Sequence, residues 1–403
     1  MLIFFVTFTV LVFVYSLISK RLESTVVTAP IAFTIAGILI EVGAPTRLGF
    51  AIDPQLFLRL AEAGLVLLLF TDAGRTDLSL LWNIRELPAR ILGIALPLNI
   101  LIGAGVAWLV LPGLGLWEVA ILATILAPTD TGLAQRVVSD PRVPLRVRQA
   151  LKVETGLADG LSVPLLLFFI AFAAATGYSA NPRLARLVLE QLGYGAMVGA
   201  AIGICGSWLL VSASRLDWMS LAFTKIGVAV LPVLCLLICE AIDASMFIAA
   251  FVAGLAFQLS SRRISKDALE FGEISGQVVS LSVFTLFGII VARNWQGIDL
   301  AIAGYAVASL TVVRMLSVTI SLIGSGLSRS TVHFMGWFGP RGLASIVLGL
   351  VYLKRELNLP GESTIELVTI ATVALSIFAH GLGAGPAIAV YAGKSATNRS
   401  GGV

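Results

Sequence analysis

The sequence is short of charged residues. Aspartate, glutamate, lysine and arginine make up 12% of its 403 residues, against about 25% in soluble domains. Hydrophobic residues make up 58%. Such a chain cannot cover a folded surface with polar side chains, so we predict that lipid is its solvent. The net charge of +4 is small and scattered, which argues against a nucleic-acid partner.

Residues that hold metals or form disulfides are also scarce. The chain has three cysteines and two histidines. Cys205, Cys235 and Cys239 lie in apolar stretches and fit packing roles, without a disulfide framework or a zinc-binding spacing. There is no phosphate-binding P-loop pattern either. We therefore expect no bound cofactor, no use of ATP and no enzymatic activity.

About 13 stretches are apolar enough to cross a bilayer, which takes a helix of about 20 residues. They lie near residues 2–19, 26–43, 54–72, 88–111, 115–138, 146–176, 186–213, 218–239, 241–258, 272–292, 298–325, 333–352 and 364–391. The first lacks the basic start and the cleavage site of a signal peptide, so we expect it to stay as a membrane helix. We predict an all-α polytopic membrane protein, embedded as one unit over residues 1–392, with a polar, disordered tail at 393–403.

Basic residues are divided unequally between the two sets of loops. About 15 fall in the odd-numbered loops and the tail, and about 6 fall in the even-numbered loops. Because cytoplasmic loops carry the excess of lysine and arginine, we expect the N-terminus outside and the C-terminus in the cytoplasm. The expected location is the cell (inner) membrane of a prokaryote.

Seven charged residues are expected to lie near the bilayer centre, where each costs at least about 2.5 kcal/mol. They are Glu62, Asp130, Lys152, Glu154, Asp159, Arg314 and Arg341. Glu62 stands three residues after Arg59, so a local ion pair explains it as well as a function does. The others are candidates for a site.

Two of these charges lie in sequences that interrupt helices. The fifth span contains Pro128-Thr129-Asp130-Thr131-Gly132, and the twelfth contains Gly339-Pro340-Arg341-Gly342. Proline removes a backbone hydrogen bond, and unwound backbone at membrane depth is tolerated only where it is buried or lines a cavity. Broken helices at matching places in two halves indicate a transporter site. We predict an inverted repeat of spans 4–6 and 11–13.

The sixth span supplies further oxygen atoms. Thr155 and Asp159 are four residues apart, hence on one helix face. Hard cations prefer oxygen ligands, so we predict a Na⁺ site formed by Asp159, Asp130, the Thr155 hydroxyl and the Thr129 carbonyl. Asp130 has the alternative role of capping the half-helix that follows it. Glu154 faces away from this site and needs a cation, for which Arg341 is the expected partner.

The predicted site is suited to the exchange of a cation for a proton. A carboxylate in a low-dielectric cavity is poised between holding a proton and binding a cation, and loading one expels the other. Competition for Asp159, combined with access that alternates between the two sides of the membrane, is sufficient for antiport of a monovalent cation against protons.

The interrupted spans resemble motifs of the cation:proton antiporter superfamily, in the branch of sodium/proton exchangers that includes NhaP-type proteins. Thr129-Asp130 resembles the Thr-Asp of the family's broken helix, and Gly339 to Gly342 resembles its Gly-x-Arg-Gly. The stretch from Glu154 to Gly160 resembles its Glu-Ser-Gly-x-Asn-Asp-Gly. Weaker likenesses lie at Leu69–Asp72, Phe247–Gly254, Val313–Val318 and Ser376–Gly381.

The resemblance implies a fold and roles for residues. It implies about 13 helices with two broken helices that cross at mid-membrane. It implies a core domain near 88–176 and 298–391, and a dimer or scaffold domain near 1–72 and 186–292 that joins two copies. Asp159 would bind the transported ion or proton, Asp130 and Thr129 would line the site, and Glu154 and Arg341 would form a structural ion pair.

The chain departs from the family pattern at Ala158, where the family has Asn or a second Asp. Without a second carboxylate we expect electroneutral one-for-one exchange. Thr155 keeps the hydroxyl of the family's serine, while Arg314 and Ala158 are expected to affect the core around the site.

The leading interpretation is a Na⁺ (or Li⁺)/H⁺ antiporter in the lipid bilayer, with the cation and the proton as its partners. A K⁺/H⁺ antiporter is the alternative, because Ala158 leaves a looser site. A cation channel is disfavoured because no tetrameric filter-like repeat is present. An intramembrane aspartyl enzyme is disfavoured because the nearby Arg341 and threonine oxygens suit ion coordination better.

Overall fold

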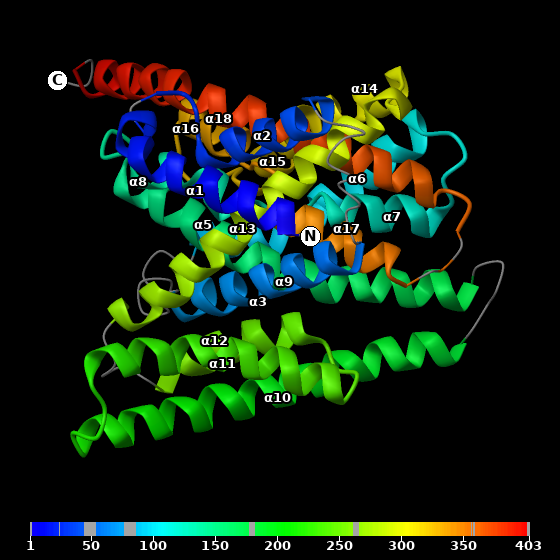
Figure 1. Ribbon diagram of the computed structural model, residues 1–403. Coiled ribbons are helices and arrows are strands. Elements are labelled where there is room, and N and C mark those ends of the chain that lie inside the picture. Colours follow the sequence, from blue (N-terminus) through cyan, green and yellow to red (C-terminus); the bar gives the residue numbers. More distant parts are fainter. Residues whose placement is uncertain are drawn as a thin grey trace.

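The computed structural model describes residues 2–23, 25–43, 54–75, 86–176, 182–260, 266–355, 357 and 359–400. All regular secondary structure in these ranges is helical (Figure 1). Within them, eight helices are long and apolar enough to cross a membrane, and four shorter apolar helices accompany them. The predicted all-α membrane fold is thus confirmed, while the count of about 13 crossings stays a prediction.

The helices follow the predicted spans. They are α1 (Leu2–Glu23), α2 (Ala29–Gly43), α3 (Pro54–Arg75), α5 (Glu86–Arg90), η1 (Ile91–Ala95), α6 (Leu96–Val110), α7 (Leu116–Ile125), α8 (Thr131–Ser139), α9 (Leu145–Thr176), α10 (Pro182–Arg215), α11 (Leu221–Ala241), α12 (Met246–Ser260), η2 (Lys266–Leu269), α13 (Glu270–Asn294), η3 (Trp295–Gly297), α14 (Leu300–Ala308), η4 (Ser309–Val313), α15 (Arg314–Ser321), α16 (Arg329–Trp337), α17 (Leu343–Leu353) and α18 (Glu362–Ser400). One expectation is corrected: α18 continues to Ser400, so most of the tail predicted to be disordered is helical.

Both predicted interruptions are present. The fifth span is divided into α7 and α8 around Pro128, and the twelfth is divided into α16 and α17 around Pro340. The two unwound segments meet, because the Asp130 N–H donates to the Pro340 carbonyl at 2.7 Å. Such a meeting satisfies backbone groups that neither lipid nor a helix would satisfy.

The helix before each broken helix carries the same irregularity. Five-residue π-helical segments, η1 (Ile91–Ala95) and η4 (Ser309–Val313), interrupt the helices that precede α7 and α16. Segments of this kind are rare and are frequent at functional sites. Their matching positions support the inverted repeat, although the sequence pattern did not indicate them.

Helices α10, α11 and α12 form a layer at one side of the molecule, at the bottom in Figure 1. Helix α12 joins this layer to α3, and α13 packs against both α2 and α3. Contact between α10 and α12 is close. A Cβ added at Gly195, Gly199 or Gly203 would lie 2.3–2.6 Å from a carbonyl oxygen of the α12 segment, so glycine is required there.

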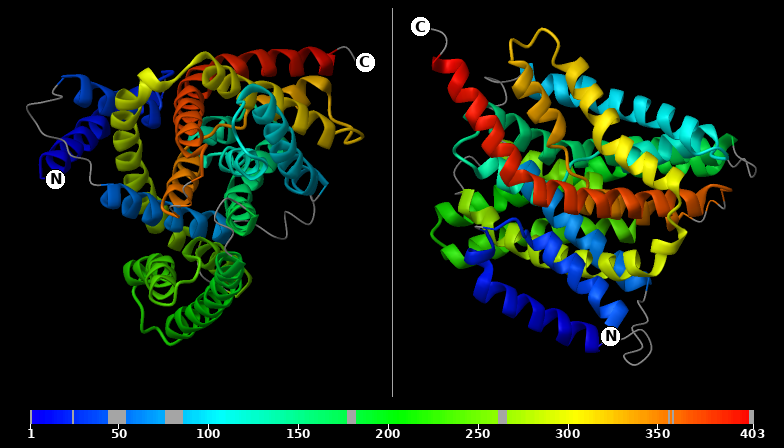
Figure 2. Two further views of the ribbon diagram at one scale, coloured as in Figure 1. Left: turned by 90° about the vertical axis from the view of Figure 1, so that its right-hand side faces the viewer. Right: turned by 90° about the horizontal axis from the view of Figure 1, so that it is seen from above.

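The helix bundle has two ends that differ in which helices start and finish there. We call the end where α1, α8 and α18 finish and where α9 and α13 start the basic face; it lies to the left in Figure 1. The opposite face is where α3 and α18 start and α17 finishes. The C-terminal end of α18 extends away from the bundle at the basic face (Figure 2).

Candidate functional site

Asp159 is the buried carboxylate at the centre of the site. It lies midway along α9 with 9% of its surface exposed. Its Oδ1 atom is buried, and no described residue gives it a hydrogen bond. An unsatisfied buried carboxylate oxygen is costly, so this atom is expected to bind a proton or an ion.

A cavity of about 780 Å³ reaches Asp159. Asp72, Asp130 and Thr131 line it near Asp159, and the ends of α1 and α8 line it farther out, at Thr25 and Asp140. Those helix ends belong to the basic face. The cavity therefore provides a path between the basic face and Asp159.

Asp130 caps two helices at once. Its Oδ1 accepts the Leu133 N–H of α8 at 2.8 Å, and its Oδ2 accepts the Leu343 N–H of α17 at 2.7 Å. The N-terminal ends of both half-helices therefore point at one carboxylate, whose negative charge compensates their dipoles. Both oxygens are already used, which favours the capping role that the sequence left open.

Gly342 makes this double cap possible. A Cβ at this position would lie 2.4 Å from the Asp130 Oδ2 and 2.6 Å from its Cγ. No side chain fits between the unwound segment and Asp130, so the glycine of the predicted motif is needed for the close approach.

The two threonines of the predicted site lie deeper than the cavity wall. Thr129 and Thr155 are both buried, and neither lines the cavity. The Thr155 hydroxyl donates to the Lys152 carbonyl at 3.1 Å, whereas the Thr129 hydroxyl has no hydrogen-bond partner among the described residues. Ala158 is buried and places a methyl group where the family carries a polar side chain.

The expected partner of Glu154 was wrong. Glu154 forms an ion pair with Arg314 at 2.5 Å, and both side chains are almost fully buried. Arg314 follows the π-helical segment η4 and lies against Gly339, where an added Cβ would be 2.2 Å from its Nε. The missing side chain at Gly339 leaves room for the guanidinium group to reach Glu154.

Arg341 instead stabilises the loop in which it lies. Its side chain donates to the Gly339 carbonyl, and its backbone N–H donates to the Ser376 hydroxyl at 2.6 Å. It is fully buried, and the described residues place no carboxylate within ion-pair distance of it. The expected Glu154–Arg341 pair is therefore replaced by Glu154–Arg314, and Arg314 has a defined role.

Asp72 belongs to the site, although it was not among the predicted site residues. Its Oδ2 accepts the Thr131 hydroxyl at 3.1 Å, and it packs against Gly156, one turn from Asp159. It lines the same cavity. The weak likeness of Leu69–Asp72 to a family motif was the signal that could have identified it.

His380 connects α18 to both sides of the second unwound segment. One ring nitrogen lies 3.0 Å from the Trp337 carbonyl and the other 3.1 Å from the Ser376 hydroxyl, which accepts the Arg341 N–H. The second nitrogen, Nδ1, also lies 3.1 Å from the Ser376 carbonyl. The pair Ser376 and His380 thus satisfies the backbone on either side of the interruption.

The described residues contain no group of three or more His, Cys, Asp or Glu side chains that could hold a metal ion. Asp72, Asp130 and Asp159 share a cavity, but they are not gathered into a dedicated cage. A cation here would need backbone carbonyls or water to complete its shell.

Known proteins resemble this chain along nearly its whole length. Residues 7–390 match the family described as sodium/hydrogen exchanger, transmembrane. The fold resembles the sodium proton antiporter MjNhaP1 from Methanocaldococcus jannaschii, with a TM-score of 0.76, 18% identity and coverage of 97% of this chain and 99% of that chain. At this identity the likeness concerns the fold alone.

Two curated relatives are similar to about two thirds of this chain. A protein of Schizosaccharomyces pombe named Na⁺/H⁺ antiporter is 26% identical over 65% of this chain and 59% of its own length. A Bacillus subtilis protein named sodium, potassium, lithium and rubidium/H⁺ antiporter is 25% identical over 66% of this chain and 39% of its own length. The chain thus spans between about two fifths and three fifths of these relatives.

The family match covers most of the chain, and the fold likeness agrees with it. This chain is an integral membrane protein that belongs to the transmembrane sodium/hydrogen exchanger family.

Proposed function

We propose that this protein is a secondary antiporter that exchanges Na⁺ or Li⁺ for H⁺, and that both ions compete for Asp159. The observation that carries the proposal is the buried Asp159 Oδ1, which has no hydrogen-bond partner among the described residues and lies at a cavity open to the basic face. A group held ready by the fold but left without a protein partner suits a transported ligand.

The residues around Asp159 have separate roles in this proposal. Asp130 compensates the positive ends of α8 and α17, so it fixes the crossing of the broken helices and leaves Asp159 as the exchanging carboxylate. Glu154 and Arg314 neutralise each other on the far side of α9. A cation that enters through the cavity replaces the proton on Asp159, and carbonyl, hydroxyl or water oxygens complete its coordination. Thr129 and Thr155 are the candidates for such oxygens that the sequence indicates.

One cation for one proton is the proposed stoichiometry. Ala158 removes the second carboxylate that would stand directly beside Asp159. Asp72 shares the cavity, but it is engaged by the Thr131 hydroxyl, and Asp130 is engaged by two backbone N–H groups. Exchange of equal charges would not respond to the membrane potential, and a potential-dependent rate would contradict this stoichiometry.

K⁺/H⁺ exchange is the second candidate. The methyl group of Ala158 in place of a polar side chain leaves more room for a larger cation, and one relative is named for sodium, potassium, lithium and rubidium. The two candidates share Asp159 and differ only in the order of cation selectivity.

The setting in the membrane is part of the proposal. We place the protein in the cell membrane of a prokaryote with its basic face toward the cytoplasm, since basic loops stay on that side. The division into core and scaffold domains, and the assembly of two copies through the scaffold, rest on the family resemblance.

Purified protein in acid-loaded proteoliposomes tests the proposal. Addition of Na⁺ or Li⁺ should collapse the pH gradient with the wild-type protein but not with Asp159→Asn, whose folding is checked by size-exclusion chromatography. A response to K⁺ alone would favour the second candidate. A pH gradient that no cation collapses would overturn the proposal.

A further inference from the structure

Lys354 and Glu62 form an ion pair at the opposite face, at the far end of the molecule from the cavity mouth. The Lys354 Nζ lies 3.1 Å from Glu62 Oε1. Lys354 follows the end of α17, while Glu62 lies on α3. The Glu62 side chain is only 4% exposed, so its charge depends on this partner far more than a surface carboxylate would.

Polar contacts beside the Lys354–Glu62 pair involve further helices. Arg355, the next residue, donates to the side-chain oxygen of Gln191 on α10 at 3.0 Å. Arg59 lies 3.9 Å from Glu62 and pairs with Glu240 on α11. Two consecutive basic residues after α17 therefore bind two different helices of the proposed scaffold, at the face where few basic residues were predicted.

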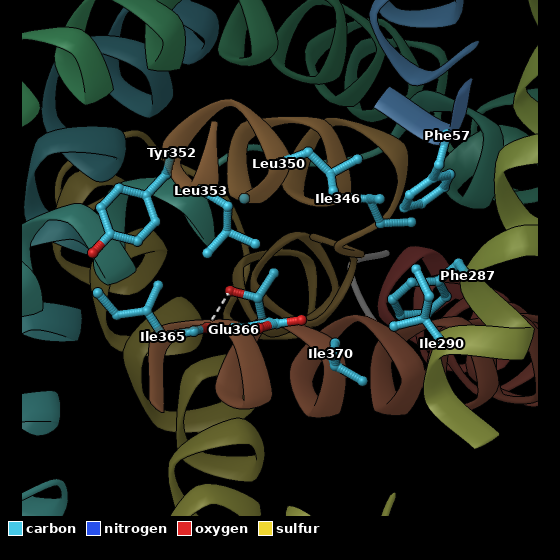
Figure 3. Close-up of a pocket in the computed structure, with 12 residues that line it drawn as sticks. Phe57, Phe287, Ile290, Ile346, Leu350, Tyr352, Leu353, Ile365, Glu366 and Ile370 are labelled. Atoms are coloured by element: carbon cyan, nitrogen blue, oxygen red, sulfur yellow. Dashed lines mark hydrogen bonds between the residues drawn. The ribbon is translucent and has the colours of Figure 1, made fainter. Parts of the chain in front are cut away.

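The packing beside this ion pair is incomplete. An apolar pocket of about 50 Å³ lies between α3 and α13 on one side and α17 and α18 on the other (Figure 3). Glu366 lines it together with Phe57, Phe287 and Leu350, and within the described part of the chain its carboxylate has no hydrogen bond or ion pair. Glu366 is half-buried in the second turn of α18, and an ionisable residue in an apolar pocket is a candidate for an ion pathway.

We propose that Lys354 and Glu62 form a charge clasp, which closes a second ion entrance between α3/α13 and α17/α18 with Glu366 at its mouth. The clasp holds the end of α17 against α3 while the cavity is open at the basic face, and it separates when Asp159 is exposed to the opposite face. This inference rests on the proposed antiport, because an exchanger needs access from both sides.

The clasp joins two groups of helices that would move relative to each other during transport. Helices α17 and α18 contain or contact the crossing at Asp130 and Arg341, so they move with the ion site. Helices α3 and α13 pack against each other and against the layer formed by α10, α11 and α12. If the two groups of helices slide past each other, a contact between the groups must break, whereas a contact within one group persists.

Thiol labelling in nanodiscs tests the clasp, because the reagent then reaches both faces. Leu350→Cys, at the pocket, is introduced after Cys205, Cys235 and Cys239 are changed to alanine. We expect slow labelling by a charged, membrane-impermeant methanethiosulfonate reagent. Glu62→Gln or Lys354→Gln should each speed labelling about five- to tenfold, the range of a modest coupling between conformations. The double variant should label no faster than either single variant.

A matched control is the Glu41–Arg293 ion pair, which joins α2 to α13 at 3.0 Å within the proposed scaffold. Glu41→Gln should leave the labelling rate unchanged. Equal acceleration by Glu41→Gln, no acceleration by the clasp variants, or multiplied effects in the double variant would each overturn the clasp. Labelling does not require transport, so this result is independent of whether the protein exchanges cations.

Discussion

The buried Glu154–Arg314 pair gives the sharpest test of how the core is held together. Both side chains are at most 4% exposed, and the charged atoms are 2.5 Å apart. Replacing one partner by glutamine leaves the other charge uncompensated in a dry environment, which costs about 3–5 kcal/mol. For a chain of this length that cost corresponds to a fall of about 4–6 °C in melting temperature.

The assay is a double-mutant cycle on purified protein in detergent, read by the melting temperature. Glu154→Gln and Arg314→Gln should each destabilise the protein, and the double variant should recover a large part of the loss because no lone charge is left. Arg341→Gln is the matched control, since Arg341 is equally buried and lies near the same carboxylate. It should destabilise the protein through its own loop but show little coupling to Glu154.

A different pattern would refute the reasoning. Stronger coupling of Glu154 to Arg341 than to Arg314 would restore the pairing expected from the sequence. Additive effects in both cycles would mean that neither arginine neutralises Glu154.

Other consequences concern the crossing and the packing around it. Asp130→Ala removes two charge-assisted caps of about 1 kcal/mol each, so we expect a loss of about 2 kcal/mol and a large fall in exchange, measured by thermal melting and proteoliposome flux. Gly342→Ala should damage exchange through the same contact, and a normal rate would exclude the close approach. His380→Ala should lower the exchange rate, His380→Gln should restore part of it by keeping a donor and an acceptor, and His333→Ala, on an exposed position of α16, should have no effect. Gly199→Leu should prevent α10 from packing on α12 and reduce the yield of folded protein, measured by fluorescence-detected size exclusion.

The broken helices could be predicted because their signal is local. Proline, glycine and a charge within a long apolar stretch admit few structures in a membrane, and both interruptions lie where the sequence placed them. The position of Asp159 on α9 followed in the same way from its charge and depth. The predicted break between the spans near 218–239 and 241–258 is also present, and the chain turns there with Asp243 at a φ of 52°.

The ion-pair partner could not be predicted because it depends on rotation between helices. The π-helical segment η4 shifts the direction in which Arg314 points, and no feature of the residues at 309–313 announces that segment. The second cap made by Asp130 was equally unpredictable, because it comes from Leu343, more than two hundred residues away. To identify Asp72 as a site residue, one would have had to know which part of α3 lies beside Gly156.

Proton release on cation binding tests the central claim most directly. Purified protein in weakly buffered detergent is titrated with NaCl near the pH at which Asp159 is half protonated, and the released protons are counted with a pH indicator. If the two ions compete for Asp159, the wild-type protein should release up to about one proton per Na⁺ bound, and Asp159→Asn should release none. Unchanged proton release by Asp159→Asn would contradict the account and move the exchanging group elsewhere, with Asp72 as the first residue to examine.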